Sequence, residues 1–483
     1  MSLANELARL DATAQAALVE SGEATPLELV EAACARVEAL NPQLNALIHP
    51  ALERAVDTAK RSDLPAGPFR GVPFVMKDIG GDEAGAPYHA GMRMLKNADY
   101  VAPTDSYFTE RLDAAGLVSL GRAATSELAI LPAGSTLAHG NVHNPWKLGY
   151  ETGGSSGGAG AVVAAGIVPM AHGSDGGGSI RIPAAHCGVV GLKPSRGRCS
   201  FGPALGERWS GLSCEFALTR TVRDSAALLD CVSGRVPGDP YSAPPPSGPF
   251  ADAVTRPPGR LRIGFMNDTP REIEIHPECV RAVEQTAKLL EDLGHDVELA
   301  HPPALEEQEI VAHYVTVVAA NVGRALASWG EKLGRDAVPE DVEPLTWNLA
   351  QQAQGITAPQ FLATLEYVHG FGRRVSQWWE GGFDLLLTPT TAQPPPPHGV
   401  LMSSEKEPLK AYFLAAPYGV FTLPHNISGQ PGISLPLHVS EDGLPIGSQL
   451  VGQIGDEEKL LAVAAQIEAA APWSQRIPPV FAG

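Results

Sequence analysis

Three residues of types that could carry out acyl transfer, Lys77, Ser155 and Ser179, stand in unusual sequence surroundings. Lys77 directly follows a short apolar run, and the serines lie in the glycine-rich segments 152–158 and 173–185. Each feature alone indicates little, because a lysine after a strand is usually a solvated charge and a Gly/Ser cluster is usually a loop. Their combination is far more specific and favours nucleophilic chemistry, in which a base removes the proton of a serine hydroxyl.

Other motif interpretations fail on their surroundings. A G-x-S-x-G match at 153–157 would mark the nucleophile elbow of an α/β-hydrolase, but the preceding segment 147–152 is not an apolar strand. Neither His425 nor His438 is singled out as a partner for that serine. No Gly-Lys-Ser/Thr follows the glycines, so a phosphate-binding loop is excluded. A Ser-x-x-Lys match at 403–406 lacks the accompanying motifs of β-lactamases.

The order of the three segments, with the continuations 181–185 (Arg-Ile-Pro-Ala-Ala) and 187–194, resembles the amidase-signature family. The agreement runs from the first predicted helix to Pro436. The resemblance implies a Ser–cis-Ser–Lys triad and a mixed central sheet covered on both faces by helices, which is an α/β fold.

In that triad, the resemblance implies Ser179 as the nucleophile, Ser155 on a cis peptide after Gly154 as the bridging residue, and Lys77 as the base. Lysine can accept a proton only where burial lowers its pKa enough to leave the amine neutral. Ser155 would pass the proton of Ser179 to Lys77 and later return it to the leaving amine.

The resemblance also implies an oxyanion hole formed by the backbone before the nucleophile, and glycines suit that role because consecutive N–H groups can converge on one oxygen. The expected donors are the backbone N–H groups of Gly176, Gly177, Gly178 and Ser179. The residues expected to support the loop are Gly154, Ser156, Asp175 and Arg181. The family usually has a side chain where Gly176 stands, so this loop is expected to be roomier or more flexible.

The resemblance implies that residues 128–146 lie near the acyl pocket, and this segment contains no Lys, Arg, Asp or Glu. The residues predicted to line it are Ala129, Ile130, Gly134, Ser135 and Trp209. A lining without charge disfavours charged substrates. His139 and His143 have the His-x3-His spacing of one half of a metal site, but no further ligand is evident in the sequence near them. We therefore expect both to be structural histidines. The segment 199–214 is expected to act as a gate.

Composition excludes several classes of function. The net charge of −19 would repel phosphate backbones and anionic membrane surfaces. The six cysteines form no C-x-x-C pair, and the longest apolar stretch noted, 159–171, is too short to span a bilayer. No signal peptide is evident. We therefore expect a cytoplasmic monomer or homodimer with a small-molecule substrate, without cofactor, metal, nucleic acid or membrane partner.

We expect one domain over 1–483 with four parts. Thr25 and Glu28 form a predicted capping box, and Asn41-Pro42 is expected to end that helix. The parts are an N-terminal helical segment (1–62), the signature core (63–235), a linker or loop (236–259), and a C-terminal part (260–483) with a helical substrate-lid region (304–380).

The expected function is hydrolysis of carbon–nitrogen acyl bonds in neutral, fairly apolar amides, extending to aryl esters and carbamates, that is, urethanase activity. The alternative is a glutaminase subunit of a tRNA-dependent amidotransferase. Glutamine is zwitterionic and requires charged pocket residues, which the uncharged segment 128–146 does not offer. A binding protein without catalysis is a third hypothesis, disfavoured because every triad position is filled.

Overall fold

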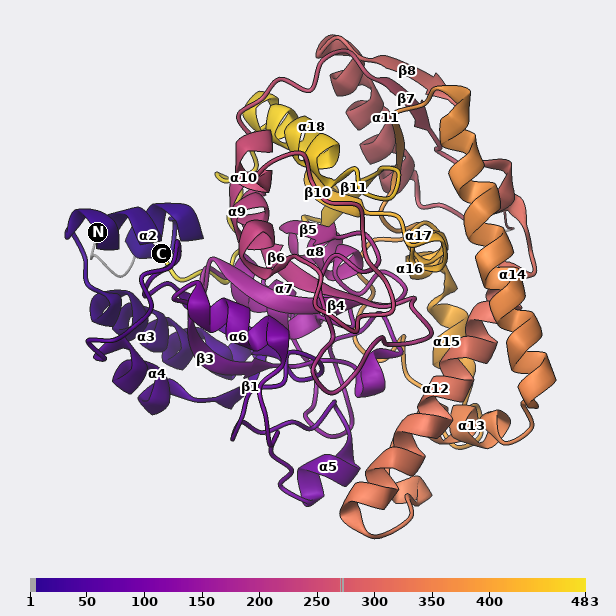
Figure 1. The fold of residues 1–483 in the computed structure, drawn as a ribbon, viewed down its shortest axis with the longest axis horizontal. Helices are drawn as coiled ribbons and strands as arrows, with labels where there is room; N and C mark the ends of the chain where they lie inside the picture. The colour runs from indigo at the N-terminus through magenta and orange to yellow at the C-terminus, as the bar shows by residue number, and fades with distance from the viewer. Residues whose placement is uncertain (1–5, 270, 272) are drawn as a thin grey trace.

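A computed structural model, which describes residues 6–269, 271 and 273–483, is built around one mixed β-sheet (Figure 1). Over these residues the sheet has 11 strands. In sheet order they are β1 (Leu47–Pro50), β3 (Val118–Ala123), β2 (Pro73–Lys77), β4 (Met170–Asp175), β6 (Cys214–Thr219), β5 (Val190–Lys193), β10 (Gly432–Val439), β11 (Pro445–Val451), β9 (Leu385–Pro389), β7 (Arg262–Phe265) and β8 (Asp296–Leu299). Neighbours β3–β2, β2–β4, β9–β7 and β7–β8 are parallel, and the other pairs are antiparallel.

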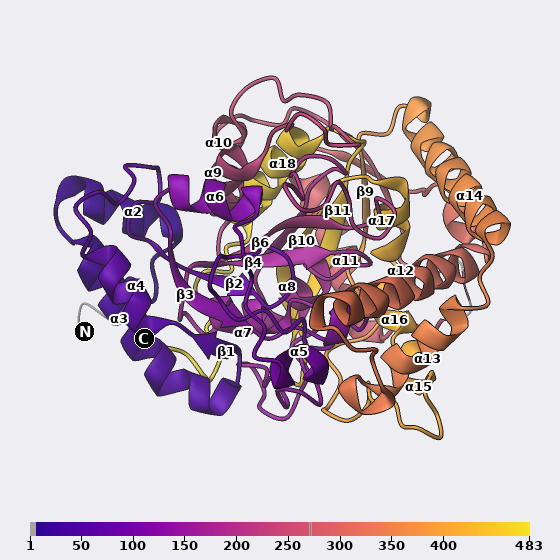
Figure 2. The same cartoon turned by 60° about the horizontal axis from the view of Figure 1, so that its bottom comes forward.

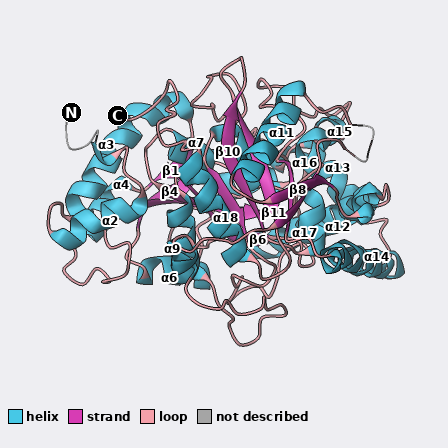
Figure 3. Ribbon diagram, turned by 90° about the horizontal axis from the view of Figure 1, so that it is seen from above, coloured by secondary structure: helices cyan, strands magenta, loops and turns pink. Residues whose placement is uncertain are grey.

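Helices flank this sheet, which confirms the predicted α/β fold (Figure 3). They are α2 (Ala12–Ser21), α3 (Pro26–Leu44), α4 (Leu52–Ala59), α5 (Arg93–Asn97), α6 (Tyr107–Ala114), α7 (Gly157–Ala164), α8 (Arg181–Cys187), α9 (Val222–Val232), α10 (Phe250–Ala253), α11 (Pro277–Asp292), α12 (Ile310–Leu333), α13 (Pro344–Ala353), α14 (Ala358–Gln377), α15 (Lys410–Leu414), α16 (Ala416–Gly419), α17 (Leu423–Ser428) and α18 (Glu457–Ala470).

The N-terminal segment follows the sequence signals with two exceptions. Thr25 and Glu28 form the predicted capping box at the start of α3. The prediction that Asn41-Pro42 ends this helix is wrong, because α3 continues to Leu44 and closes at Asn45 in the left-handed conformation (φ 51°). A proline so close to the helix end removes one backbone hydrogen bond at most. The segment 1–62 also contains strand β1, so it is not wholly helical.

The middle of the sheet brings together two of the segments predicted to carry site residues. Strand β2 is buried along its whole length and ends at Lys77, as the sequence predicted. The apolar stretch 159–171 divides into the end of α7 and the start of β4, whose last residue is Asp175. Because β2 and β4 are parallel neighbours, their carboxyl ends lie at the same edge of the sheet. The loops that follow Lys77 and Asp175 therefore share one region.

Helices α12, α13 and α14 form a separate helical layer beside the sheet (Figures 1 and 2). They share a hydrophobic core whose fully buried members include Val317, Leu349 and Phe371. By length and composition alone, α12 is apolar enough to cross a membrane, with a mean hydropathy of 1.4 over its most apolar window. The expectation that the sequence holds no such stretch is therefore wrong, although one face of α12 packs against α13 and α14.

Candidate active site

Three segments place their polar side chains together at the ends of β2 and β4. Lys77 is fully buried, and its Nζ lies 2.7 Å from Ser155 Oγ and 3.0 Å from Ser174 Oγ. The Gly154–Ser155 peptide bond is cis. Ser179 lies just before α8 and is 9% exposed, so it is the hydroxyl of the predicted triad that reaches the surface of a cavity. Sequence patterns did not single out Ser174, although it directly precedes Asp175 at the end of β4.

A backbone hydrogen bond connects the segments that carry the two predicted serines. The Ser156 N–H donates to the carbonyl oxygen of Ser179, at 3.2 Å. Within the described residues no hydrogen bond joins Ser179 Oγ to Ser155 Oγ. Catalytic hydrogen bonds are often long without substrate and shorten in the substrate complex. The structure therefore shows the contact between Ser155 and Lys77 that the predicted triad requires, and the contact between Ser179 and Ser155 stays a prediction.

Burial determines the protonation state of Lys77. Removal from water lowers the pKa of Lys77 to about 7, against the opposing effect of the carboxylates of Asp175 and Glu215. The largest cause is desolvation, which disfavours the charged ammonium. A substantial fraction of Lys77 is therefore neutral near pH 7 and able to accept a proton.

The backbone before Ser179 offers a cluster of free donors. The N–H groups of Gly176, Gly177 and Ser179 have no hydrogen-bond partner within the described part of the chain. The prediction that Gly178 is one of the oxyanion donors is wrong, because its N–H donates to Asp175 Oδ1 at 2.8 Å. The candidate oxyanion hole is thus reduced to three donors, and the Gly178 N–H fixes the loop instead.

A buried ion pair holds this loop in place. Asp175 and Arg181 are both fully buried and joined by two hydrogen bonds, of 2.9 and 3.0 Å. Arg181 holds the pKa of Asp175 well below its usual range, against the raising effect of burial. Asn426 donates to Asp175, and Gln449 accepts from Arg181 at 2.7 Å. No sequence pattern indicated Asn426 or Gln449, because they lie more than 200 residues away along the chain.

Trp209, from the segment 199–214, packs against Gly176. A Cβ atom at Gly176 would lie 2.8 Å from Trp209 Cε3, which is too close for any side chain. The expectation of a roomier loop at Gly176 is therefore wrong, because the indole ring occupies the space. The indole also meets Tyr314 edge to face, with ring centroids 6.4 Å apart, and the Tyr314 hydroxyl donates to the carbonyl oxygen of Gly176.

Replacing Gly176 with alanine should lower kcat by about 10²-fold, the usual effect of losing one oxyanion donor. The added methyl group must displace either the Trp209 ring or the backbone that carries the donor. The measurement is release of 4-nitroaniline from an anilide substrate. The double variant Gly176→Ala/Trp209→Ala should recover at least part of the lost kcat, since it makes room for the methyl group. Full activity of Gly176→Ala alone would show that the packing does not hold the loop.

A cavity of about 180 Å³ opens beside Ser179, and its walls are mainly apolar. Ala129 and Ile130 line it, as predicted. The lining also includes Val311 and Tyr314 of α12. Trp209 lies over the loop rather than among the lining residues.

Two of the predicted pocket residues lie elsewhere. Gly134 and Ser135 both donate to the carboxylate of Glu151, at distances of 3.1–3.3 Å, and serve to hold their own loop. The expectation of a lining without charge is also wrong, because Arg271 contributes to the cavity. Arg271 lies in the connection between β7 and α11, far in sequence from 128–146, so a local reading of the sequence missed it.

Three histidines lie close together near β1, and they are the described residues that could hold a metal. One ring nitrogen from each of His49, His89 and His139 lies within 4.8 Å of the other two, so the expectation that His139 has no such neighbours is wrong. Two nitrogens on one zinc ion lie about 3.4 Å apart. The rings of His89 and His139 are stacked at 13°, so their in-plane lone pairs do not converge. The cluster supplies suitable ligands without a preformed tetrahedral geometry.

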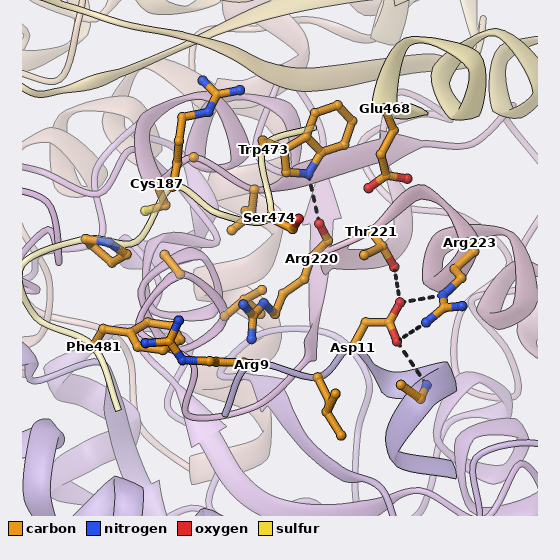
Figure 4. A pocket seen from close by; sticks show the side chains of 18 of the residues that line it. Arg9, Asp11, Cys187, Arg220, Thr221, Arg223, Glu468, Trp473, Ser474 and Phe481 are labelled. Atoms are coloured by element: carbon orange, nitrogen blue, oxygen red, sulfur yellow. Dashed lines mark hydrogen bonds and ion pairs between the residues drawn. The ribbon is translucent and has the colours of Figure 1, made fainter. Parts of the chain in front are cut away.

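A larger hollow, of about 390 Å³, lies between the N-terminal and C-terminal segments (Figure 4). Two of its charged groups bind each other, since Asp11 pairs with Arg223, and Asp11 also accepts from Thr221. The Trp473 indole N–H donates to a backbone carbonyl in the same region. Neither predicted serine lines this hollow, so the smaller cavity beside Ser179 is the candidate active site.

Comparison with known proteins agrees with this geometry. The family model described as Amidase matches residues 28–461. The chain belongs to the amidase signature family. It is 43% identical over 476 residues to the 6-aminohexanoate-cyclic-dimer hydrolase of Pseudomonas sp. (strain NK87), covering 97% of this chain and 96% of that protein.

Solved structures show the same relationship. The structure of a 6-aminohexanoate cyclic dimer hydrolase matches this amidase with a TM-score of 0.95 and 42% identity, covering 98% of this chain and 99% of the other. A bacterial aryl acylamidase matches with a TM-score of 0.88 and 28% identity, covering 97% and 98% of the two chains. The protein is therefore an amidase-family hydrolase that acts on amide bonds.

Proposed function

We propose that this amidase is a stand-alone hydrolase that cleaves amides through an acyl-enzyme on Ser179, with Ser155 and Lys77 as its proton relay. The observation that carries the proposal is the 2.7 Å hydrogen bond between Ser155 and a buried, partly neutral lysine. A buried amine hydrogen-bonded to a hydroxyl next to a second, accessible serine is the arrangement that serine activation requires.

The proposed reaction follows from the positions of the groups. Ser179 Oγ attacks the amide carbon while its proton passes through Ser155 to Lys77 Nζ. The developing oxyanion accepts from the free N–H groups of Gly176, Gly177 and Ser179. The relay then returns the proton to the leaving nitrogen, the carbon–nitrogen bond breaks, and water hydrolyses the acyl-enzyme by the reverse route.

The apolar cavity supports substrates whose chains beside the scissile amide are hydrocarbon. The similarity to hydrolases of 6-aminohexanoate cyclic dimer supports amides of ω-aminoalkanoates as candidates. We extend the proposal to aryl esters and aryl carbamates, because each presents a planar acyl carbon to the same donors. Matched 4-nitroanilide, 4-nitrophenyl ester and 4-nitrophenyl carbamate substrates test this range. Turnover of none of the three by the folded enzyme would contradict it and direct attention to a glutaminase role.

The rate should rise with pH through the titration of Lys77. Because burial lowers the pKa of Lys77 to about 7, the neutral base is lost below that pH and fully present above it. We expect kcat/KM to fall about tenfold per pH unit below pH 6 and to level off above pH 8. Initial rates from pH 5 to 10 provide the measurement. A flat profile would argue against a neutral lysine as the base, and a rise centred near pH 10 would argue against a lowered pKa of Lys77.

A further inference from the structure

Two buried polar atoms in the cavity beside Ser179, one on Arg271 and one on Tyr412, make no hydrogen bond to the part of the chain that the structure describes. Arg271 is 7% exposed, and its Nη2 donates to the carbonyl oxygen of Val420 at 2.9 Å. Its other terminal nitrogen, Nη1, is buried and makes no hydrogen bond within the described residues. The hydroxyl of Tyr412, on α15, is likewise buried and unpartnered, and Tyr412 lines the same cavity.

The charge of Arg271 has no counter-ion among the described residues. Burial lowers the pKa of Arg271, and no Asp or Glu is among the groups that oppose this shift. A guanidinium nevertheless stays protonated in proteins. A buried charge without a partner is costly, and an unmade hydrogen bond adds to that cost. The lining around Arg271 is otherwise mainly apolar, so a negative charge supplied from outside the chain would satisfy it.

We propose that Arg271 and Tyr412 form a carboxylate-binding subsite for the end of the substrate that is remote from the scissile amide. A carboxylate can accept an N–H from Arg271 Nη1 and the O–H of Tyr412, and hydrogen bonds to a guanidinium are among the stronger ones. The substrate class is therefore amides that carry a free carboxylate at the far end of an apolar chain, such as monoamides of dicarboxylic acids and N-acyl ω-amino acids. The inference rests on the proposed function, because it names the substrate of the same site.

Local contacts hold the subsite and connect it to the loop before Ser179. The Thr269 hydroxyl donates to the carbonyl oxygen of Arg271 at 2.6 Å, which fixes the backbone that carries the guanidinium. The acceptor Val420 is two residues from Thr422, whose hydroxyl donates to the carbonyl oxygen of Gly177 at 2.6 Å. One short segment thus contacts both the Arg271 guanidinium and the oxyanion loop. A carboxylate bound by Arg271 would therefore hold the substrate in a fixed position relative to the oxyanion loop.

The test compares substrates that differ only at the far end. The 4-nitroanilides of the C4 to C8 dicarboxylic acids have a free carboxylate, and each has a primary-amide counterpart of the same length. N-hexanoyl-6-aminohexanoate and its terminal amide provide the same comparison on the leaving side. We expect the best carboxylate to exceed its counterpart in kcat/KM by about 10- to 100-fold, the usual range for a charged hydrogen bond. Arg271→Gln should remove that preference, so that the carboxylate and its counterpart are turned over with kcat/KM values within about threefold of each other.

The controls separate this inference from the proposed function. Arg260→Gln, at an exposed arginine paired with Asp296, should leave the preference intact, and Arg271→Lys should retain part of it. Turnover of neutral anilides without any carboxylate preference would overturn the subsite and leave the amidase proposal standing. Equal losses on both substrates in Arg271→Gln would also overturn it. If wild type turns over no anilide, the subsite is tested by calorimetric binding of the carboxylate compounds to Ser179→Ala and to the double variant Ser179→Ala/Arg271→Gln. The subsite requires binding to the double variant to be at least about tenfold weaker, and equal binding would overturn it.

Discussion

Ser179→Ala should lower kcat for amide hydrolysis by at least about 10⁴-fold, with little change in substrate binding. The variant removes the attacking oxygen and leaves the cavity and the free N–H groups of Gly176 and Gly177 in place. Remaining activity would come from oxyanion binding and positioning alone, which typically retain a small acceleration over water. The measurement is single-turnover release of 4-nitroaniline, together with calorimetric binding of the same anilide.

A matched control uses the second Ser/Lys pattern in the chain. Ser403 accepts from the backbone N–H of Ala411 and lies in the Ser-x-x-Lys match at 403–406. Ser403→Ala should keep kcat within about twofold of wild type, as expected for a surface substitution. Loss of activity in Ser403→Ala with retention in Ser179→Ala would reverse the assignment of the nucleophile.

Lys77→Met should lower kcat by about 10³-fold and abolish the rise of kcat/KM through pH 7. Methionine fills similar space without a group that accepts a proton, so Ser155 loses the acceptor that lies 2.7 Å away. General-base catalysis typically contributes 10²–10⁴-fold, which sets the expected size. The pH profile is the more telling measurement, because misfolding alone would lower the rate without removing the inflection.

Lys193→Met is the matched control for a buried lysine. Lys193 is fully buried at the end of β5, and its Nζ donates to the carbonyl oxygen of Pro194 rather than to Ser155 or Ser179. Burial lowers the pKa of Lys193 as well. This variant should keep the pH inflection near 7 whatever it does to stability. If the inflection disappears in Lys193→Met and persists in Lys77→Met, the assignment of Lys77 as the base is contradicted.

Sequence reasoning identified what depends on local order along the chain. The positions of Lys77 at the end of a strand, Ser155 after Gly154 and Ser179 after three glycines are encoded within short segments. The capping box at Thr25 is local in the same way. Such features need no knowledge of the tertiary structure, because the residues that define them are neighbours in sequence.

The remaining features depend on contacts between distant segments. Asn426, Gln449 and Arg271 reach the site from the C-terminal half, and no periodicity or spacing connects them to Ser179. The family resemblance implied that the Gly178 N–H is an oxyanion donor, yet Asp175 accepts its hydrogen bond. The absence of a side chain at Gly176 is explained by Trp209, which packs against this glycine from a different loop.

The central claim is that the acyl group is transferred to Ser179. The most direct test is to quench the reaction with a 4-nitrophenyl ester within the first turnovers, digest the protein and locate the added acyl mass. We expect the acyl group on the peptide that contains Ser179, and we expect no acylated peptide in Ser179→Ala. Acylation of Ser155 or Ser403, or turnover by wild type without any acylated peptide, would contradict the mechanism.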